Sequence, residues 1–308
     1  MTGPAAAPRR RIAAIVNSGS GPGHGAAIVP ELQDLFARAG ARVDVHVVHD
    51  ERSIAEAIAA ARSSAPDAIV AGGGDGTVSR IAGDMAGTGL AFGVLPMGTL
   101  NHFAKDLGVP VELEDAVRTI VHGVAAAVDT AVVNDRRFVN NSSLGLYPDI
   151  VRERERQQRR LGRGKWWAFA WAAVSALRRY PLLHVRLVVD GETRTRRTPF
   201  VFVGNNAYAM EGFSIGERSS LDDGCLSLYV APLAGRWRLL LLALRALLGR
   251  LRQAKDFEAT LANEIVIESR HRRLRVAADG EVTSMNPPLR YRIEPRSLLV
   301  LRPGSAHD

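Results

Sequence analysis

The sequence predicts a doubly wound N-terminal α/β domain over residues 10–130 and a mostly antiparallel β domain over residues 131–308. Three observations support this fold class. Apolar strand-like runs alternate with helical patterns through the first 125 residues or so. After Asp129 the pattern changes to short strands joined by tight polar turns. A chain of 308 residues, 46% of them hydrophobic, is long enough for one large or two medium domains.

In the first domain, strands and helices are predicted in alternation. Such alternation indicates a parallel sheet with helices on both faces. Gly40 is the predicted C′ residue of the first helix, because glycine adopts the left-handed conformation that ends many helices. The predicted strands are 11–16, 42–48, 68–71 and 91–95, and the predicted helices are 26–39, 54–62, 78–85, 100–107 and 112–122.

In the second domain, apolar runs with strand periodicity follow one another with little helix between them. Asp190-Gly191 is a strong hairpin signal between two of these runs. A polar loop is expected at 134–136, within the first run. The predicted strands are 132–140, 182–189, 193–203, 225–230, 264–268, 273–277, 289–293 and 297–301, and two helices are predicted near 165–179 and 236–252.

The composition limits the class of protein. The formal charge of +8 favours polyanionic partners such as nucleotide phosphates, acidic lipids or nucleic acid, although an arginine-rich genome explains it equally well. Cys225 is the single cysteine, which excludes an intrachain disulfide and a CxxC zinc or redox site. The apolar runs 166–177 and 239–248 are shorter than the roughly 20 residues that span a bilayer. A cytoplasmic protein is therefore expected.

A glycine-rich loop follows the third predicted strand. Its residues are Gly72, Gly73, Gly74, Asp75, Gly76 and Thr77. Glycines at the carboxyl end of a parallel strand let backbone N–H groups approach an anion, and the next helix adds its positive end. The carboxylate of Asp75 would repel a phosphate unless a cation such as magnesium lies between them. The alternative is a simple strand-to-helix turn that Asp75 caps.

Two further loops occupy the same predicted edge of the sheet. The fourth strand is followed by Pro96-Met97-Gly98-Thr99-Leu100-Asn101, in which Thr99 and Asn101 either cap a helix or contact phosphate. The first strand is followed by the Gly- and Ser-rich segment 17–23. Three such loops at neighbouring strand ends predict a nucleotide site. A P-loop is absent, because Gly164-Lys165 is followed by Trp166.

Four motifs in order resemble the diacylglycerol kinase catalytic family, which includes bacterial lipid kinases and sphingosine kinases. They are Gly73-Gly74-Asp75-Gly76-Thr77, the stretch from Pro96 to Ala104, Leu221-Asp222-Asp223-Gly224, and Asp279-Gly280-Glu281. The resemblance covers about residues 10–302. NAD kinases share the first motif alone, so the ordered set is far more specific.

This resemblance implies an ATP-dependent kinase that phosphorylates a lipid hydroxyl, with the active site between the two domains and the last strand returning to the first. Glu281 matches the family's general base, and Asp75 and Asp129 match acidic residues around the metal and phosphates. A structural Mg²⁺ site would use Asp223 with the carbonyls of Ser220 and Cys225. ATP would contact Asn17, Ser18, Gly19, Ser20, Gly21, Gly72, Gly73, Gly74, Asp75, Gly76, Thr77, Val78, Thr99 and Asn101.

The chain departs from the family pattern at two positions. Ser18 stands where the family usually has proline, which loosens the first loop. His102 replaces the usual aspartate and removes one negative charge near the phosphates. Phosphoryl transfer needs positioning, charge neutralisation and a base, and the remaining motif residues can supply all three. Glu281 follows an Asp-Gly turn at a strand end, where its carboxylate is either aimed at a substrate or merely solvated.

Two basic segments invite a membrane interpretation. Residues 152–163 alternate arginine with glutamate and glutamine, just before Trp166, Trp167 and Trp171, and 235–252 interleaves arginines with leucines. The first is either a solvated helix face or a contact with anionic lipid, and the second either packs on its own sheet or lies along the membrane. Peripheral contact with the membrane's inner face is expected on this basis.

Competing functions are an NAD kinase, a catalytically silent lipid- or nucleotide-binding regulator, and a nucleic-acid binder. The first is disfavoured because an Asn-Glu pair early in the second domain is missing, and Asn263-Glu264 comes too late. Retained Asp75 and Glu281 argue against the second. Only charge suggests the third, since no nucleic-acid-binding motif is present. The lipid acceptor stays undetermined, and so does the oligomeric state, with a homodimer as one option.

Overall fold

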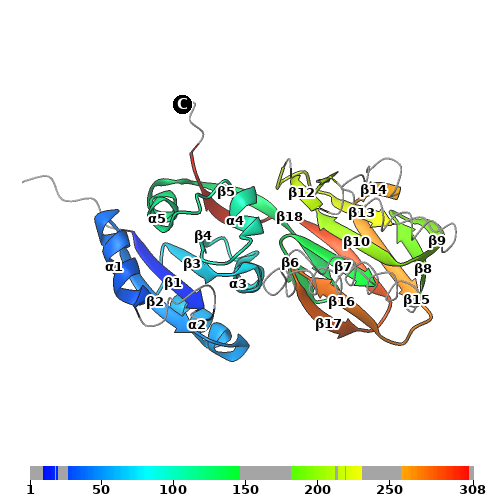
Figure 1. Ribbon diagram of the computed structural model, residues 1–308, viewed down its shortest axis with the longest axis horizontal. Helices are drawn as coiled ribbons and strands as arrows, with labels where there is room; N and C mark the ends of the chain where they lie inside the picture. Colours follow the sequence, from blue (N-terminus) through cyan, green and yellow to red (C-terminus); the bar gives the residue numbers. More distant parts are fainter. Residues whose placement is uncertain are drawn as a thin grey trace, which may run out of the picture. The chain divides into compact units, whose positions relative to one another are not determined.

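A computed structural model describes residues 10–17, 19, 27–145, 182–211, 214–218, 220–230 and 258–304 (Figure 1). The chain divides into two compact units: unit 1 is Met1–Val128 with Arg296–Asp308, and unit 2 is Asp129–Pro295. The predicted fold class, an α/β domain followed by a mostly antiparallel β domain, is confirmed. The predicted helices near 165–179 and 236–252 lie outside the described residues.

Unit 1 contains a parallel sheet in the order β2-β1-β3-β4. The central strand β3 is buried along its whole length, whereas the edge strand β2 is only partly covered. This difference explains why β3 is a continuous run of small apolar residues, as is typical of a parallel strand covered on both faces. The strands are β1 (Arg11–Asn17), β2 (Arg42–Val48), β3 (Ala68–Gly73) and β4 (Ala91–Pro96).

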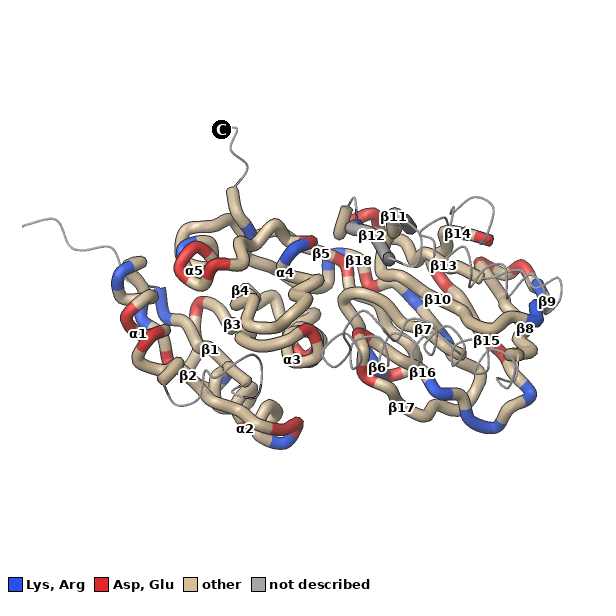
Figure 2. The backbone as a smooth tube through the Cα atoms, viewed as in Figure 1, with Lys and Arg blue, Asp and Glu red and all other residues tan. Residues whose placement is uncertain are grey.

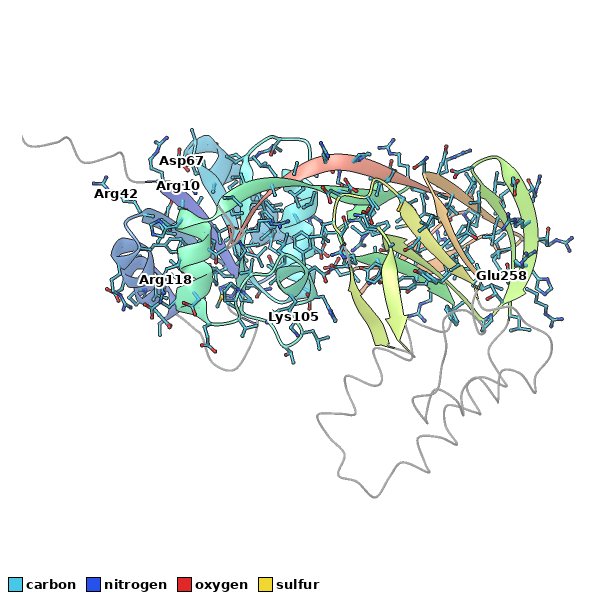
Figure 3. All side chains as sticks on the ribbon, turned by 90° about the horizontal axis from the view of Figure 1, so that it is seen from above. Arg10, Arg42, Asp67, Lys105, Arg118 and Glu258 are labelled. Atoms are coloured by element: carbon cyan, nitrogen blue, oxygen red, sulfur yellow. The ribbon has the colours of Figure 1, made fainter. Side chains whose placement is uncertain are left out.

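Helices cover the sheet of unit 1 on both faces. Right-handed crossovers through this strand order place α1 on one face and α2 and α3 on the other. Helix α5 packs beside α1, and Figure 3 shows these two together on one side of the sheet. The helices are α1 (Ile28–Arg38), α2 (Glu51–Ser63), α3 (Asp75–Met85), α4 (His102–Asp106) and α5 (Leu113–His122).

The ends of two helices show how local sequence fixes the boundaries. Gly40 has a φ of +86°, which confirms its predicted role at the end of α1. Helix α2 begins three residues earlier than the prediction, which started at residue 54. The Asp50 carboxylate accepts a hydrogen bond from the Ser53 N–H at 2.7 Å, and the Asp50 N–H donates to the Ser53 hydroxyl at 3.0 Å. This capping box stabilises the extra turn.

The last strand, β18 (Leu289–Arg302), is a single long strand rather than the two short strands predicted at 289–293 and 297–301. Its carboxyl-terminal part belongs to unit 1, where Val300 pairs in parallel with Phe92 of β4. In the same unit, the Gly87 N–H donates to the Ser297 carbonyl at 2.6 Å. The earlier part of β18 belongs to unit 2 and pairs with β15 there.

Unit 2 is built from two antiparallel sheets and a small hairpin. One sheet has the order β18-β15-β8-β9, and the other has the order β14-β13-β10-β7-β16-β17. Strands β11 and β12 form the hairpin. The strands are β7 (Asn141–Gly145), β8 (Leu183–Val189), β9 (Glu192–Thr198), β10 (Phe200–Asn205), β11 (Tyr208–Glu211), β12 (Ser214–Arg218), β13 (Leu226–Val230), β14 (Glu258–Ala262), β15 (Glu264–Ser269), β16 (Leu274–Ala278) and β17 (Glu281–Met285).

Two predicted strands of this half are wrong as single elements. The strand predicted at 132–140 is a hairpin of β5 (Val124–Val133) and β6 (Arg136–Phe138), because the chain reverses at Asn134, whose φ is +53°. The strand predicted at 193–203 divides into β9 and β10, which belong to different sheets. Pro199 lies at this division, and proline cannot donate a ladder hydrogen bond.

The apolar core of unit 2 lies between residues of both sheets. Tyr291 is fully buried at its centre, and its hydroxyl lies 3.1 Å from the Ser142 hydroxyl. The Phe138 ring meets the Tyr291 ring edge-on at a centroid distance of 6.3 Å. Burial raises the pKa of Tyr291 well above its usual value, so this phenol remains protonated in the folded chain.

Candidate active site

The glycine loop of unit 1 is tightly packed against its neighbours. A Cβ atom on Gly98 would lie 2.6 Å from the Gly74 Cα, so the two loops after β3 and β4 touch through their backbones. A Cβ atom on Gly72 would lie 3.0 Å from both the Met97 sulfur and a Val16 methyl group. Glycine is required at position 98 because the backbone of the other loop lies too close for a side chain, whereas a side chain at position 72 would press against the Met97 and Val16 side chains.

Helix α3 starts directly from this loop, and no described side chain caps its first N–H groups. Gly74 is the N-cap residue, and the first intrahelical bond runs from the Val78 N–H to the Gly74 carbonyl at 3.1 Å. The N–H groups of Asp75, Gly76 and Thr77 therefore lack intrahelical acceptors. Together with the helix dipole they form a site suited to an anion at the carboxyl end of β3.

Asp75 connects this helix start to the next loop. Its Oδ1 atom accepts a hydrogen bond from the His102 N–H at 2.7 Å, at the start of α4. The side chain is partly exposed, and its Oδ2 atom has no hydrogen-bond partner among the described residues. Asp75 thus caps α4 with one oxygen, and the second oxygen is open to a cation or to water.

Two asparagines hold the loops in shape. The Asn17 side chain donates to the Thr77 hydroxyl at 3.0 Å and accepts from the Gly19 N–H at 3.0 Å, which ties the first loop to α3. Asn101 has a left-handed backbone with φ +52°. Its amide oxygen accepts from the Gly98 N–H at 2.9 Å, and its amide nitrogen donates to the Gly98 and Pro96 carbonyls.

The structure therefore brings most of the predicted nucleotide residues together at one edge of unit 1. Asn17 contacts Thr77, and the loops after β3 and β4 touch at Gly74 and Gly98. Thr99 is exposed on the second of these loops. The predicted residues Ser18, Ser20 and Gly21 lie outside the described residues.

In unit 2, the Asp-Gly turn before Glu281 is firmly anchored. Asp279 and Gly280 have φ angles of +48° and +85° and join β16 to β17. The Asp279 carboxylate accepts three backbone hydrogen bonds, from residues 139, 140 and 141, at 2.8, 2.8 and 3.0 Å. Glu281 lies two residues after Asp279, so these bonds also fix the position of the Glu281 Cα atom.

Arg136 holds the carboxylate of Glu281. Its guanidinium group forms an ion pair with Glu281 and donates a second hydrogen bond to the Thr283 hydroxyl. The Arg136 and Glu281 side chains are 30% and 42% exposed, so both remain accessible to a substrate. Sequence reasoning missed Arg136, which it placed only in a polar loop. The hairpin at Asn134 that positions it gave no functional signal.

Asp129 is almost fully buried, at 1% exposure, and belongs to unit 2. Its Oδ2 atom accepts from the Gly224 N–H at 2.7 Å, and its own N–H donates to the Leu221 carbonyl at 2.8 Å. Asp129 therefore anchors the 220–225 turn, which holds the three predicted metal ligands. The family resemblance implied that Asp129 lies around the metal and the phosphates, and that this turn holds a separate structural magnesium ion.

The predicted metal ligands Ser220, Asp223 and Cys225 share this turn. The Ser220 hydroxyl donates to an Asp222 oxygen at 2.7 Å, and the Cys225 carbonyl accepts from the Asn206 N–H at 2.9 Å. Asp223 is exposed. Partial burial, followed by the charges of Asp223 and Asp129, raises the pKa of the Cys225 thiol.

Comparison with known proteins places these features in a family. Residues 11–133 match the family model of the diacylglycerol kinase catalytic domain, and residues 148–302 match that of the YegS C-terminal NAD kinase beta sandwich-like domain. An uncharacterized protein of Synechocystis sp. is 33% identical over 53% of this chain, and the match covers only 37% of that relative.

Two further similarities extend over nearly the whole chain. A diacylglycerol kinase of Mycobacterium tuberculosis is 29% identical over 95% of both chains. The crystal structure of a diacylglycerol kinase from Bacillus anthracis has the same fold, with a TM-score of 0.69, 20% identity, and coverage of 95% of this chain and 97% of that one. The two family models follow each other in order and together match most of the sequence, so the chain belongs to the diacylglycerol kinase catalytic-domain family.

Proposed function

We propose that this chain is a lipid kinase that transfers the γ-phosphoryl group of ATP to a hydroxyl group of a diacylglycerol-like lipid. The observation that carries the proposal is the uncapped start of α3, packed against the loop after β4, in a chain of this family. The names of its relatives supply the acceptor class, since a match over 95% of both chains is a diacylglycerol kinase.

The nucleotide is assigned to the loops of unit 1. The N–H groups of Asp75, Gly76 and Thr77 point along the axis of α3 and suit phosphate oxygens. The contact between Asn17 and Thr77 orders the first loop beside them. Binding through backbone N–H groups needs no bulky side chain, and the close approach of Gly98 to the Gly74 backbone leaves no room for one at that position.

Magnesium is proposed as the cation that accompanies ATP. The open Oδ2 atom of Asp75 fits this role, because Mg²⁺ prefers carboxylate and phosphate oxygens. No cluster of three or more His, Cys, Asp or Glu side chains lies together in the part of the chain that the structure describes. The ATP-bound ion would therefore depend on phosphate oxygens. An ion in the 220–225 turn would use Asp223 with the backbone carbonyls of Ser220 and Cys225.

Glu281 is assigned as the general base of the reaction. Its carboxylate would take the proton of the acceptor hydroxyl while that oxygen bonds to the γ-phosphorus. The bond between the γ-phosphorus and the bridging oxygen then breaks, and ADP leaves with that oxygen. Arg136 and the anchored turn at Asp279 orient the carboxylate beforehand. Such positioning is the main contribution that a protein makes to phosphoryl transfer.

Radiolabelled ATP, magnesium and a panel of acceptors test this proposal. The panel includes dispersed short-chain diacylglycerol, phosphatidylglycerol, a sphingoid base and NAD. We expect label in a lipid product, and a loss of about 10²–10⁴-fold in kcat for Glu281→Gln. Asp75→Asn should lose activity and require more magnesium.

Two matched variants control for the loss of a charge. Glu264→Gln changes an exposed carboxylate at the start of β15, and Asp84→Asn changes one near the end of α3. Both should retain activity within about threefold, because surface substitutions away from a site have small effects. Label in NADP rather than in lipid, or wild-type rates for Glu281→Gln, would refute the assignment.

A further inference from the structure

The connection between β15 and β16 in unit 2 is unusually basic. Four consecutive residues, Arg270, His271, Arg272 and Arg273, form what we call the arginine loop, and all four are exposed. Figure 2 shows this connection as a run of Lys and Arg segments between the two strands. The loop lies outside the proposed catalytic residues and outside both basic segments considered from the sequence.

The topology of unit 2 places a second connection beside this loop. Residues 270–273 cross from the sheet of β15 to the sheet of β16, and residues 286–288 cross back from β17 to β18. Ile267 pairs with Leu289, and Leu274 pairs with Met285. These paired residues lie next to the ends of both connections. Residues 270–273 and 286–288 therefore lie at the same end of unit 2.

Between the two crossings lies a surface hollow of about 610 Å³. Its walls are the arginine loop, Ser269, Asn286 and Pro287, so the residues that line it include three arginines and one histidine and no Asp or Glu. The volume is within the range of small-molecule sites, but apart from Pro287 the residues that line it are charged or polar. A negatively charged group with several oxygen acceptors is the ligand that this lining suits.

The described residues of unit 2 do not neutralise the charges of the loop. Glu268, the nearest acidic residue in sequence, is already paired with Arg186 at 3.4 Å. Among the described residues, none of the three loop guanidinium groups has an ion-pair or hydrogen-bond partner. Like charges crowded into four residues repel one another, and an external anion relieves this repulsion.

We infer that the arginine loop docks unit 2 onto the anionic headgroups of a bilayer. The inference rests on the proposed function, because a kinase with a diacylglycerol-like substrate must work where that lipid resides. Phosphodiester headgroups match guanidinium groups in charge and geometry. Nucleic acid carries the same phosphodiester chemistry, but the hollow has no Phe, Tyr or Trp ring on which successive bases could stack.

The test is co-sedimentation of the full chain with vesicles of phosphatidylcholine alone or with 30% phosphatidylglycerol. The test variant is R270Q/R272Q/R273Q. Its matched control is R38Q/R42Q/R62Q, which removes three exposed arginines of unit 1 at the sheet edge away from the glycine loops. The two variants have the same net charge, so any difference in vesicle binding between them is due to the positions of the arginines.

Each arginine near an anionic surface contributes about fivefold to partitioning at moderate ionic strength. We therefore expect the loop variant to partition on the order of 100-fold more weakly onto anionic vesicles. The control should lose less than about threefold, and wild-type binding should weaken as salt rises. Equal binding by the loop variant and wild type, or equal losses in both variants, would overturn the inference. Tighter loop-dependent binding to duplex DNA at the same salt would also overturn it.

Activity on dispersed short-chain diacylglycerol separates this inference from the proposed function. That substrate needs no docking, so the loop variant should phosphorylate it at the wild-type rate while losing activity on anionic vesicles. An inactive wild type on every acceptor would refute the proposed function, and the vesicle partitioning would still decide the role of the loop. Unchanged activity of the loop variant on both substrates would refute the docking role.

Discussion

Replacing Asp279 with alanine should destabilise the chain more than the same replacement at Asp190. The two residues are closely matched, since each is the first residue of an Asp-Gly hairpin turn. Their φ angles are +48° and +46°, and the glycines that follow have φ angles of +85° and +90°. The strain of alanine in a left-handed backbone, about 1 kcal/mol, is therefore common to both variants and cancels in the comparison.

The difference comes from the hydrogen bonds that each carboxylate accepts. Asp279 is half-buried and accepts three backbone bonds at 2.8, 2.8 and 3.0 Å. Asp190 is exposed and accepts two, both at 3.1 Å. With partial exposure, each bond to Asp279 contributes about 1 kcal/mol, and each bond to Asp190 about half as much. Asp279→Ala should therefore cost about 2 kcal/mol more than Asp190→Ala.

Urea unfolding followed by circular dichroism measures this difference. With a slope of about 3 kcal/mol per molar, the midpoint of Asp279→Ala should lie roughly 0.7 M below that of Asp190→Ala. Hydrogen exchange adds a local measurement, because the amides of residues 139–141 should lose protection only in the first variant. Equal midpoints with unchanged protection would show that the Asp279 carboxylate does not anchor the turn before Glu281.

Three further changes test other parts of the structure. Gly98→Ala should weaken nucleotide binding by about tenfold, as measured by calorimetry, because the new Cβ would lie 2.6 Å from the Gly74 Cα. Iodoacetamide should alkylate Cys225 more slowly than a free thiol at pH 8, because burial and then Asp223 and Asp129 raise its pKa. Asp223→Asn should speed this reaction, and an unchanged rate by mass spectrometry would contradict the charge effect. Burial raises the pKa of Tyr291, so the phenol of the unfolded chain ionises at a lower pH than that of the folded chain. The stability that this difference contributes is therefore present below about pH 10 and is lost as the pH rises further. Tyr291→Phe should flatten that decline in urea midpoints between pH 9 and 11.

The sequence was sufficient for the alternating half of the fold and for the position of its loops. Strand β2 has the predicted bounds, and the glycine loop follows β3 as expected, because strand–helix alternation has few solutions. The first part of β5 was not predicted, since its alanine-rich residues carry no strand periodicity. The predicted strand 193–203 divides at Pro199 because β9 and β10 pair in different sheets. No local sequence pattern specifies the sheet in which each part pairs.

For the candidate site, the sequence located the motifs but not their internal partners. Arg136 and Glu281 are 145 residues apart in the chain, and their ion pair follows from the antiparallel sheets of unit 2. Asp129 and Gly224 are separated by 95 residues and meet for the same reason. Pairing over such distances depends on strand register, which one sequence without relatives does not specify.

The hydrogen-bond partners divide the polar motif residues into two kinds that the sequence does not distinguish. Both amide N–H groups of Asn101 bond to backbone carbonyls of its own loop, and the Asp279 carboxylate accepts three backbone hydrogen bonds. Among the described residues, the Asp75 Oδ2 atom has no hydrogen-bond partner, and Glu281 is partly exposed beside the Arg136 guanidinium group. A carboxylate whose oxygens are all occupied by backbone cannot also coordinate an ion or accept a proton without losing those bonds. The chemistry of this chain should therefore depend on Asp75 and Glu281, and Asn101 and Asp279 should act through loop shape. Asp75→Asn and Glu281→Gln keep a side-chain oxygen for the His102 N–H and for Arg136, so they should lower kcat with little change in the urea midpoint, whereas variants of the second pair should lower both together.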